Sequence, residues 1–316
     1  IKLSKNIKIN FYNKDFLKHT FDAGYDLVIG NPPFGKIKDK KILKEYKDSG
    51  NNSGNNLFAL FLNKSLQLSK NVALVLPKSF ISSPEHDQIR KKIESRNIFS
   101  ILDFGEYGFK GVKIETIGLI LNGKKKLYNK VKFYSYANKN YILQDQDYII
   151  DSEFPYWLLY RNNFFDKICK KMKFGIFDFF RDRQITKKHT LNKGKIRVLK
   201  SRNISNNNIL SLDGYDTYLN DINNFVVSKY LNKKNTYLVP NLTYYPRACK
   251  LPENCIVDGS AALLFPKNDQ KINNKQLEFF ASEEFTSFYR IARNFGTRSL
   301  NIDRNSIFFW GLKKVI

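Results

Sequence analysis

Residues 26–34 read Asp-Leu-Val-Ile-Gly-Asn-Pro-Pro-Phe, and this stretch decides how the first part of the chain is interpreted. The short apolar run Leu27–Ile29 favours a buried strand. Pro32 and Pro33 fix two successive φ angles and remove two N–H donors, so they end the strand. The residue before a proline is held in an extended conformation. Asn31 is therefore expected in a rigid loop at the carboxyl end of the strand, where open α/β sheets bind their ligands.

The side chains of this loop suit methylation of an exocyclic amino group. The amino nitrogen of adenine is a poor nucleophile because its lone pair is delocalised into the ring. The neutral amide oxygen of Asn31 and the backbone carbonyl of Pro32 would accept its two hydrogens and localise the lone pair. Phe34 offers a flat face to an extruded base, and such stacking typically contributes ~1–3 kcal/mol. The alternative is an ordinary Asn-Pro turn after a strand.

With these neighbours, the loop resembles that of the gamma class of N6-adenine DNA methyltransferases, which carry a C-terminal target-recognition domain. The resemblance implies an α/β fold: the C-terminal part of a Rossmann-like, S-adenosylmethionine-dependent sheet, followed by an α+β recognition domain. It assigns catalysis to Asn31–Phe34. It also likens Asp15 and Phe16 to the acidic-aromatic element that holds the cofactor, with Asp15 accepting from the adenine amino group and Phe16 packing on the ring. A turn or helix cap is the alternative role for Asp15.

A Gly-rich loop covers Phe104–Val112, between the last two strands expected in the catalytic sheet. It resembles the family loop whose aromatic residue stacks on the opposite face of the flipped adenine. Phe109 is the predicted stacking residue, with Tyr107 as the alternate. The competing interpretation is a Gly-rich hairpin with an incidental exposed aromatic residue. The resemblance therefore predicts that adenine lies between Phe34 and Phe109.

The family's glycine-rich cofactor loop and its ribose-binding acid should both precede Asp15. Only fourteen residues do so here; they contain no Gly-x-Gly pattern, and the chain starts at Ile1 rather than Met. We therefore expect the sequence to be the C-terminal portion of a longer polypeptide or one half of a split enzyme. The chain alone is then expected to bind S-adenosylmethionine weakly or not at all.

Composition points to a globular protein with a polyanionic partner. The 316 residues allow two domains, and 42% hydrophobic content supports real cores. The 54 Lys and Arg residues exceed the 29 Asp and Glu residues, for a net charge of +25. Such an excess favours double-stranded DNA, although an AT-biased genome also raises lysine content. Three cysteines without a Cys-x-x-Cys pair, and three histidines, predict no metal site. No membrane segment or signal peptide is visible, so a cytoplasmic location is expected.

The chain is expected to contain a partial catalytic domain over 1–150, a linking helix over 151–173 and a target-recognition domain over 174–316. The linking helix rests on an amphipathic pattern from Phe154 to Met172. Arginine suits guanine in the major groove, but phosphate or structural roles are more common for any one residue. The candidates for DNA binding are Arg202, Arg247 and Arg298.

The sequence therefore predicts a site-specific DNA adenine-N6 methyltransferase that flips its target base and belongs to a restriction-modification system. A fused or cognate restriction endonuclease is a further expected partner. The alternatives are an RNA or protein-glutamine methyltransferase and a noncatalytic DNA-recognition module. The long basic C-terminal half argues against the first alternative, and the intact Asn31–Phe34 loop argues against the second.

Overall fold

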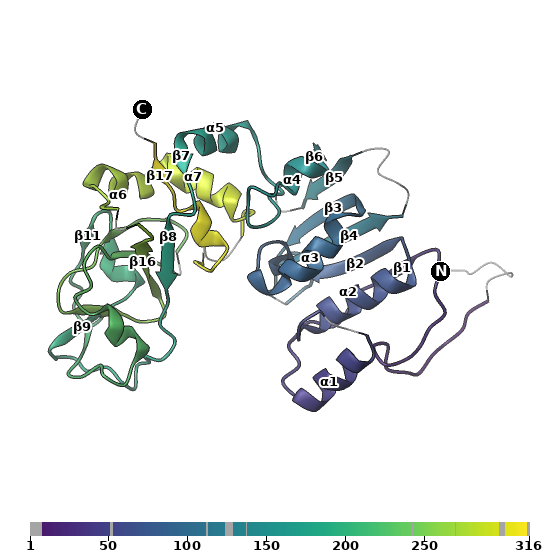
Figure 1. The fold of residues 1–316 in the computed structure, drawn as a ribbon, viewed down its shortest axis with the longest axis horizontal. Helices are drawn as coiled ribbons and strands as arrows, with labels where there is room; N and C mark the ends of the chain where they lie inside the picture. The colour runs from purple at the N-terminus through teal and green to yellow at the C-terminus, as the bar shows by residue number, and fades with distance from the viewer. Residues whose placement is uncertain are drawn as a thin grey trace. The chain divides into compact units, whose positions relative to one another are not determined.

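The computed structural model describes residues 8–50, 53–111, 113–123, 129–136, 138–241, 243–268, 270–296 and 301–314. They divide into two compact units, each treated by itself below (Figure 1). The first unit comprises Ile1–Phe80, Glu85–Phe104 and Thr116–Leu143, and the second comprises Ile81–Pro84, Gly105–Glu115 and Gln144–Ile316.

A mixed sheet forms the centre of the first unit. Its strand order is β1-β2-β4-β3-β5-β6. The strands are β1 (Val28–Gly30), β2 (Val72–Pro77), β3 (Asn97–Gly105), β4 (Thr116–Asn122), β5 (Lys130–Ser135) and β6 (Asn140–Asp145). Strand β1 runs parallel to β2, whereas β4 runs antiparallel to β2. Within the described residues β1 pairs on one side only, and the Ile29 side chain is 75% exposed.

Helices cover one face of this sheet (Figure 1). These are α2 (Leu57–Leu68) and α3 (Asp87–Glu94), whereas α1 (Lys40–Asp48) lies beyond α2 and buries no residue. The 3-10 turns η1 (Lys78–Ile81) and η2 (Pro84–His86) precede α3. Helix α2 buries Phe58, Leu60 and Leu62, which contributes much of the apolar burial in the unit. Its Lys64 is also buried, and its ammonium donates to the carbonyls of Leu17, at 3.2 Å, and His19, at 2.8 Å. Lys64 therefore holds the segment before β1 against the helix.

The second unit combines short helices with small sheets. Its helices are α4 (Gln146–Ile149), α5 (Asn163–Lys171), α6 (Asn274–Phe280) and α7 (Glu283–Ala292), with η3 (Ser201–Asn203), η4 (Val226–Tyr230) and η5 (Ser306–Phe309). Its strands are β7 (Met172–Lys173), β8 (Phe177–Phe180), β9 (Ile196–Leu199), β10 (Ile204–Ser205), β11 (Asn208–Ile209), β12 (Thr217–Leu219), β13 (Tyr237–Pro240), β14 (Cys249–Lys250), β15 (Cys255–Val257), β16 (Ala261–Pro266) and β17 (Leu312–Lys313). The larger sheets have the orders β14-β13-β16-β8 and β12-β9-β15. An aliphatic core lies between these sheets and includes Val198, Leu238, Ile256 and Leu263.

The segment expected to form a linking helix differs from the prediction in extent and in place. Helix α5 spans only Asn163–Lys171, because Asn162 is extended and its side chain accepts from the amide of Phe165 at 3.0 Å. The Phe165 ring stacks on Phe288 of α7 with centroids 4.8 Å apart. The helix is therefore part of the core of the second unit, whose longest segment begins at Gln144.

The described ranges contain no helix with the length and apolarity needed to cross a bilayer. A group of three or more His, Cys, Asp or Glu side chains that could hold a metal ion is likewise absent from these ranges.

Candidate active site

The Asn31–Phe34 loop leaves β1 at its carboxyl end, as the proline pair predicts. Asn31 is exposed, Pro32 is buried and Phe34 is half-buried. Two backbone hydrogen bonds tie the following residues to the start of α2: Leu57 donates to the carbonyl of Gly35 at 2.9 Å, and Ile37 donates to that of Asn55 at 2.8 Å. Gly35 has a φ of 140°, a conformation that favours glycine. The loop is therefore held in a defined position beside a buried helix.

An ion pair fastens the same loop to a second element. The Lys36 ammonium lies 2.5 Å from a carboxylate oxygen of Glu85, which is in the η2 turn before α3. Partial burial opposes ionisation of Glu85, but the hydrogen bond from Lys36 and nearby positive charge outweigh it and hold the pKa of Glu85 below its ordinary value. The Lys36–Glu85 pair could not be predicted from the sequence, because no local pattern connects two residues so far apart in the chain.

Behind Phe34 lies an aromatic cluster with a buried histidine. The Phe34 ring meets Phe58 edge-on, with centroids 6.4 Å apart, and Phe58 in turn meets His86 at 4.8 Å. His86 is only 2% exposed. Burial lowers the pKa of His86 to about 4, although the carboxylate of Glu85 opposes this shift. The imidazole is therefore neutral at neutral pH and acts as one more ring supporting Phe34 from behind.

This histidine should make stability depend on pH. Its pKa of about 4 in the folded state lies below the unfolded value of about 6.5, so the unfolded chain takes up the proton first as pH falls. The contribution of His86 is complete above about pH 6.5 and is lost progressively towards about pH 4. Between about pH 7 and about pH 4, the free energy of unfolding of the parent should fall by up to about 3 kcal/mol more than that of His86→Phe. This variant keeps an aromatic ring at position 86 but does not titrate. Urea denaturation at about pH 7 and about pH 4 measures this difference, and identical pH dependence in both proteins would contradict it.

Asp15 and Phe16 lie together against α1 and α2. The exposed Asp15 carboxylate accepts from the Leu17 amide at 2.8 Å and from the Tyr46 hydroxyl at 2.9 Å, so it does cap a turn. Phe16 stacks on Phe61 with centroids 4.9 Å apart. Each carboxylate oxygen has two acceptor sites, so Asp15 can also accept from a ligand amino group. The capping role therefore leaves Asp15 able to accept from a ligand, and cofactor binding by Asp15 and Phe16 stays a prediction.

The predicted stacking partner of Phe34 lies in the other unit. Phe109 is half-buried in the second unit, whereas Asn31 and Phe34 belong to the first. Tyr107, the alternate, is 71% exposed. An adenine held between Phe34 and Phe109 stays a prediction.

Arg247 and Arg202 differ in what their guanidinium groups contact. Arg247 donates to the carbonyls of Ser201, Ile204 and Tyr245 and to the Thr243 hydroxyl, at distances of 2.5 to 3.0 Å. These bonds tie the loop of Arg247 to η3 and β10, so the geometry favours a structural role over base reading. Arg298 lies outside the described residues.

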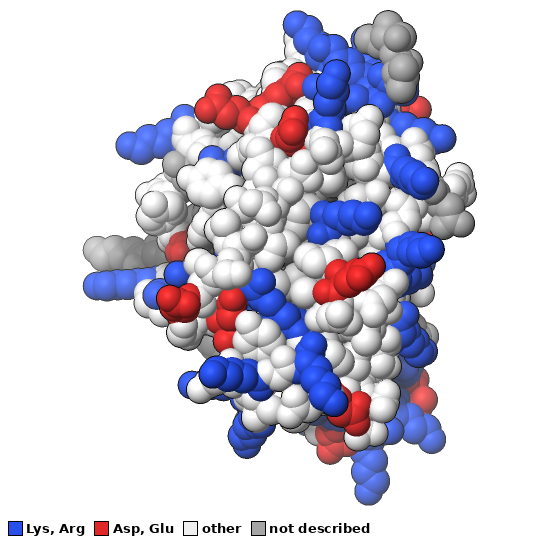
Figure 2. Space-filling model, turned by 90° about the vertical axis from the view of Figure 1, so that its left-hand side faces the viewer, with Lys and Arg blue, Asp and Glu red and all other residues white. Residues whose placement is uncertain are grey.

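Arg202 is exposed, and its guanidinium lies 4.8 Å from the centre of the Tyr215 ring. The Lys200 ammonium lies 4.5 Å from the same ring and donates to the Tyr215 carbonyl at 2.6 Å. Figure 2 shows Lys and Arg side chains spread widely over one face of the molecule, with Asp and Glu between them. Arg202 is therefore the exposed one of the two described candidates, and its DNA binding stays a prediction.

Known proteins resemble parts of this chain. Residues 1–109 match the family described as Eco57I restriction-modification methylase. The Type II methyltransferase M.VspI of Vibrio sp. (strain 343) is 30% identical over 118 residues, which are 35% of this chain and 29% of the relative. The chain thus spans less than a third of that relative's length.

Among solved structures, the Type IIL restriction-modification enzyme MmeI in complex with DNA has a TM-score of 0.51 at 13% identity, covering 90% of this chain and 46% of MmeI. A nuclease-deletion mutant of the Type ISP restriction-modification enzyme LlaGI has a TM-score of 0.47 at 12% identity, covering 90% and 40%. The likeness to MmeI concerns the fold. The family match relates the first third of this chain to restriction-modification methylases, and the M.VspI likeness agrees with it.

Proposed function

We propose that this chain carries the methyl-transfer loop and the target-recognition domain of a site-specific DNA adenine-N6 methyltransferase in a restriction-modification system. The observation that carries the proposal is the exposed Asn31 at the carboxyl end of β1, followed by a loop fastened to α2 by its backbone and to η2 by the Lys36–Glu85 pair.

The chemistry follows from acceptors held in place. S-adenosylmethionine, when bound, supplies an electrophilic methyl group. The Asn31 amide oxygen and the Pro32 carbonyl accept the two amino hydrogens of adenine, which localises the nitrogen lone pair without an ionised base. Because the contacts of Gly35 and Lys36 hold the loop in advance, these acceptors need little reorganisation during the reaction. Phe34 supplies a stacking face for the extruded base.

Duplex DNA is the proposed substrate for three reasons. The net charge of +25 favours a polyanion. The fold resembles that of MmeI, which was solved in complex with DNA. The relation of residues 1–109 to restriction-modification methylases points to the same class of substrate.

The proposal is tested with the full-length gene product, methyl-labelled S-adenosylmethionine and unmethylated duplex DNA. The DNA is digested to nucleosides, and the labelled nucleoside is identified by mass spectrometry. Label in N6-methyl-deoxyadenosine is the expected result. Label in RNA or protein, with none in DNA, would support the role proposed for the methyl-transfer loop but reject DNA as the substrate.

Phe109→Ala should weaken catalysis and leave cofactor binding nearly intact. The loss of one stacked aromatic ring should lower kcat/KM about 10- to 100-fold, because base stacking is worth ~1–3 kcal/mol. Steady-state kinetics on duplex DNA and calorimetry with S-adenosylmethionine measure the two effects separately. Tyr107→Ala, in the same loop, tests the alternate assignment: a loss of activity in this variant and not in Phe109→Ala would move the stacking role to Tyr107. Equal losses of activity and cofactor affinity in Phe109→Ala would remove the stacking assignment.

A further inference from the structure

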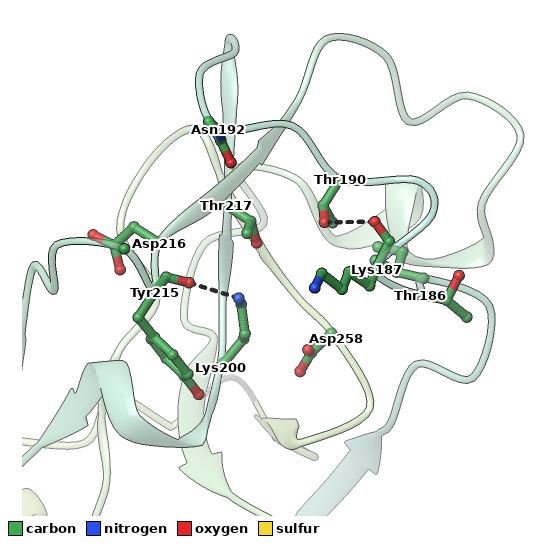
Figure 3. A pocket seen from close by; sticks show the side chains of 11 residues that line it. Thr186, Lys187, Thr190, Asn192, Lys200, Tyr215, Asp216, Thr217 and Asp258 are labelled. Atoms are coloured by element: carbon green, nitrogen blue, oxygen red, sulfur yellow. Dashed lines mark hydrogen bonds between the residues drawn. The ribbon is translucent and has the colours of Figure 1, made fainter.

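The second unit contains a polar cleft of about 710 Å³ (Figure 3). Its walls come from the segment 185–192 and the turn 214–217, together with Lys200 and Asp258. We propose that this cleft binds the sugar-phosphate backbone of duplex DNA. This inference rests on the proposed function, because it takes DNA as the partner. It assigns a DNA contact to residues other than the three arginines considered above.

One wall of the cleft is a turn held rigid by its own hydrogen bonds. The His189 ring nitrogen Nδ1 accepts from the Thr186 amide at 3.1 Å, and the His189 amide donates to the Thr186 carbonyl at 3.0 Å. The Thr190 hydroxyl donates to the Lys187 carbonyl at 3.2 Å. The His189 ring also packs edge-on against Phe225, with centroids 5.2 Å apart. The turn is therefore preorganised, which lowers the entropy cost of binding a ligand.

Lys187 is the cation that this turn presents to the cleft. Its side chain is exposed and points into the hollow, on the same side as Asp258 (Figure 3). Within the described part of the chain, its ammonium has no hydrogen bond or ion pair. A solvated lysine without an internal partner can exchange water for a phosphate oxygen at little cost.

The remaining charges leave the cleft favourable for an anion. Asp216 is neutralised by Arg197, with its carboxylate oxygen 2.6 Å from the guanidinium. Asp258 accepts from the amide and hydroxyl of Ser260, at 2.9 and 2.6 Å, so one of its oxygens is already engaged. Residues 183–202, which supply much of the wall, contain eight Lys and Arg residues and no Asp or Glu. This basic stretch includes Arg202, whose guanidinium lies on the ring of Tyr215, a residue lining the cleft.

The shape and the donor types favour phosphate over base edges. Lysine ammonium, threonine hydroxyl and asparagine amide groups are the side chains that usually contact DNA phosphates. A hollow accommodates the convex ridge of a strand backbone, whereas base edges lie inside a groove and are read by side chains that project into it. The cleft offers such donors in Lys187 and Asn192, whereas the Thr190 hydroxyl already donates to the Lys187 carbonyl.

The test measures DNA affinity of the full-length protein against salt concentration by fluorescence anisotropy, using a labelled duplex without S-adenosylmethionine. Lys187→Met should weaken binding about tenfold at about 0.1 M salt and lower the slope of log affinity against log salt by about 0.9, the value for one phosphate contact. The loss should be the same for duplexes of different sequence. Asp258→Asn should tighten binding about threefold, because it removes like charge from the cleft while its amide oxygen can still accept from Ser260.

Lys275→Met is the matched control, because Lys275 is an exposed lysine of the same unit, on α6, that does not line the cleft. Equal changes in Lys187→Met and Lys275→Met would overturn the assignment. A second result would also overturn the assignment: Asp258→Asn binds more weakly, and only to duplexes that carry one particular base pair. Reading of that base by Asp258 predicts this result. Binding by the parent that does not depend on salt would instead reject the proposed DNA function, so the two failures are distinguishable.

Discussion

Asn31→Ala is expected to lower the rate of methyl transfer about 10³-fold, with S-adenosylmethionine affinity nearly unchanged. The exposed Asn31 side chain has no hydrogen-bond partner within the described residues, so its removal should cost little stability. The substitution removes one of the two acceptors proposed for the amino group of adenine. Because the loop around it is held by Gly35 and Lys36, no neighbouring acceptor can take its place without breaking those contacts.

Single-turnover rates on duplex DNA measure this effect, and calorimetry measures cofactor binding. Asn206→Ala is the matched control, because Asn206 is an exposed asparagine in a loop of the second unit. It should behave like the parent in both measurements. A rate for Asn31→Ala within about tenfold of the parent would show that Asn31 is not one of the proposed acceptors.

The largest expected effect on stability comes from a buried ion pair in the first unit. The Lys78 ammonium, just after β2, lies 2.7 Å from a carboxylate oxygen of Asp103 on β3, and their side chains are only 7% and 1% exposed. Lys78→Met leaves the Asp103 charge buried without this cation. Removal of one partner from a buried pair typically destabilises a protein by about 3–5 kcal/mol. We expect a loss of that order in the free energy of unfolding.

Urea denaturation of the full-length protein provides the measurement. Lys78→Met combined with Asp103→Leu should recover much of the loss, because a buried pair replaced by apolar side chains is often nearly neutral. Lys44→Met, at an exposed position on α1, should change the free energy of unfolding by less than about 0.5 kcal/mol. A loss of less than about 1 kcal/mol in Lys78→Met would mean that the pair contributes little.

The features that sequence analysis predicted correctly are local ones. The strand at Val28–Gly30 and the loop after it follow from a short apolar run interrupted by two prolines, and both are confirmed. The expected burial of this strand was wrong, because within the described residues β1 pairs on one side only and Ile29 is exposed. The contacts that fix this loop were not predictable, because Lys36 and Glu85 meet only in the folded chain. The same holds for Tyr46, which donates to Asp15 from a helix far along the sequence.

Burial separates residues that look alike in the sequence. Arg202 and Arg247 lie in similar stretches rich in polar and aromatic residues, yet only Arg202 is exposed, while Arg247 donates to the Ser201 carbonyl of a distant segment. The periodicity of apolar residues was also insufficient to predict where the expected linking helix begins. An amphipathic pattern from Phe154 to Met172 cannot reveal that Asn162 starts the helix late by capping Phe165.

Within the described residues β1 pairs on one side only, and this affects how the chain behaves when concentrated. A strand with an open edge presents unpaired N–H and C=O groups to any strand that approaches it. Apolar side chains at this strand also face water: Leu27 is 50% exposed and Ile29 75%. Neither side chain carries a charge that would repel a second copy. Purification of this chain by itself will therefore be limited by colloidal stability, and a charged residue at position 29 is the simplest means of improving its solubility.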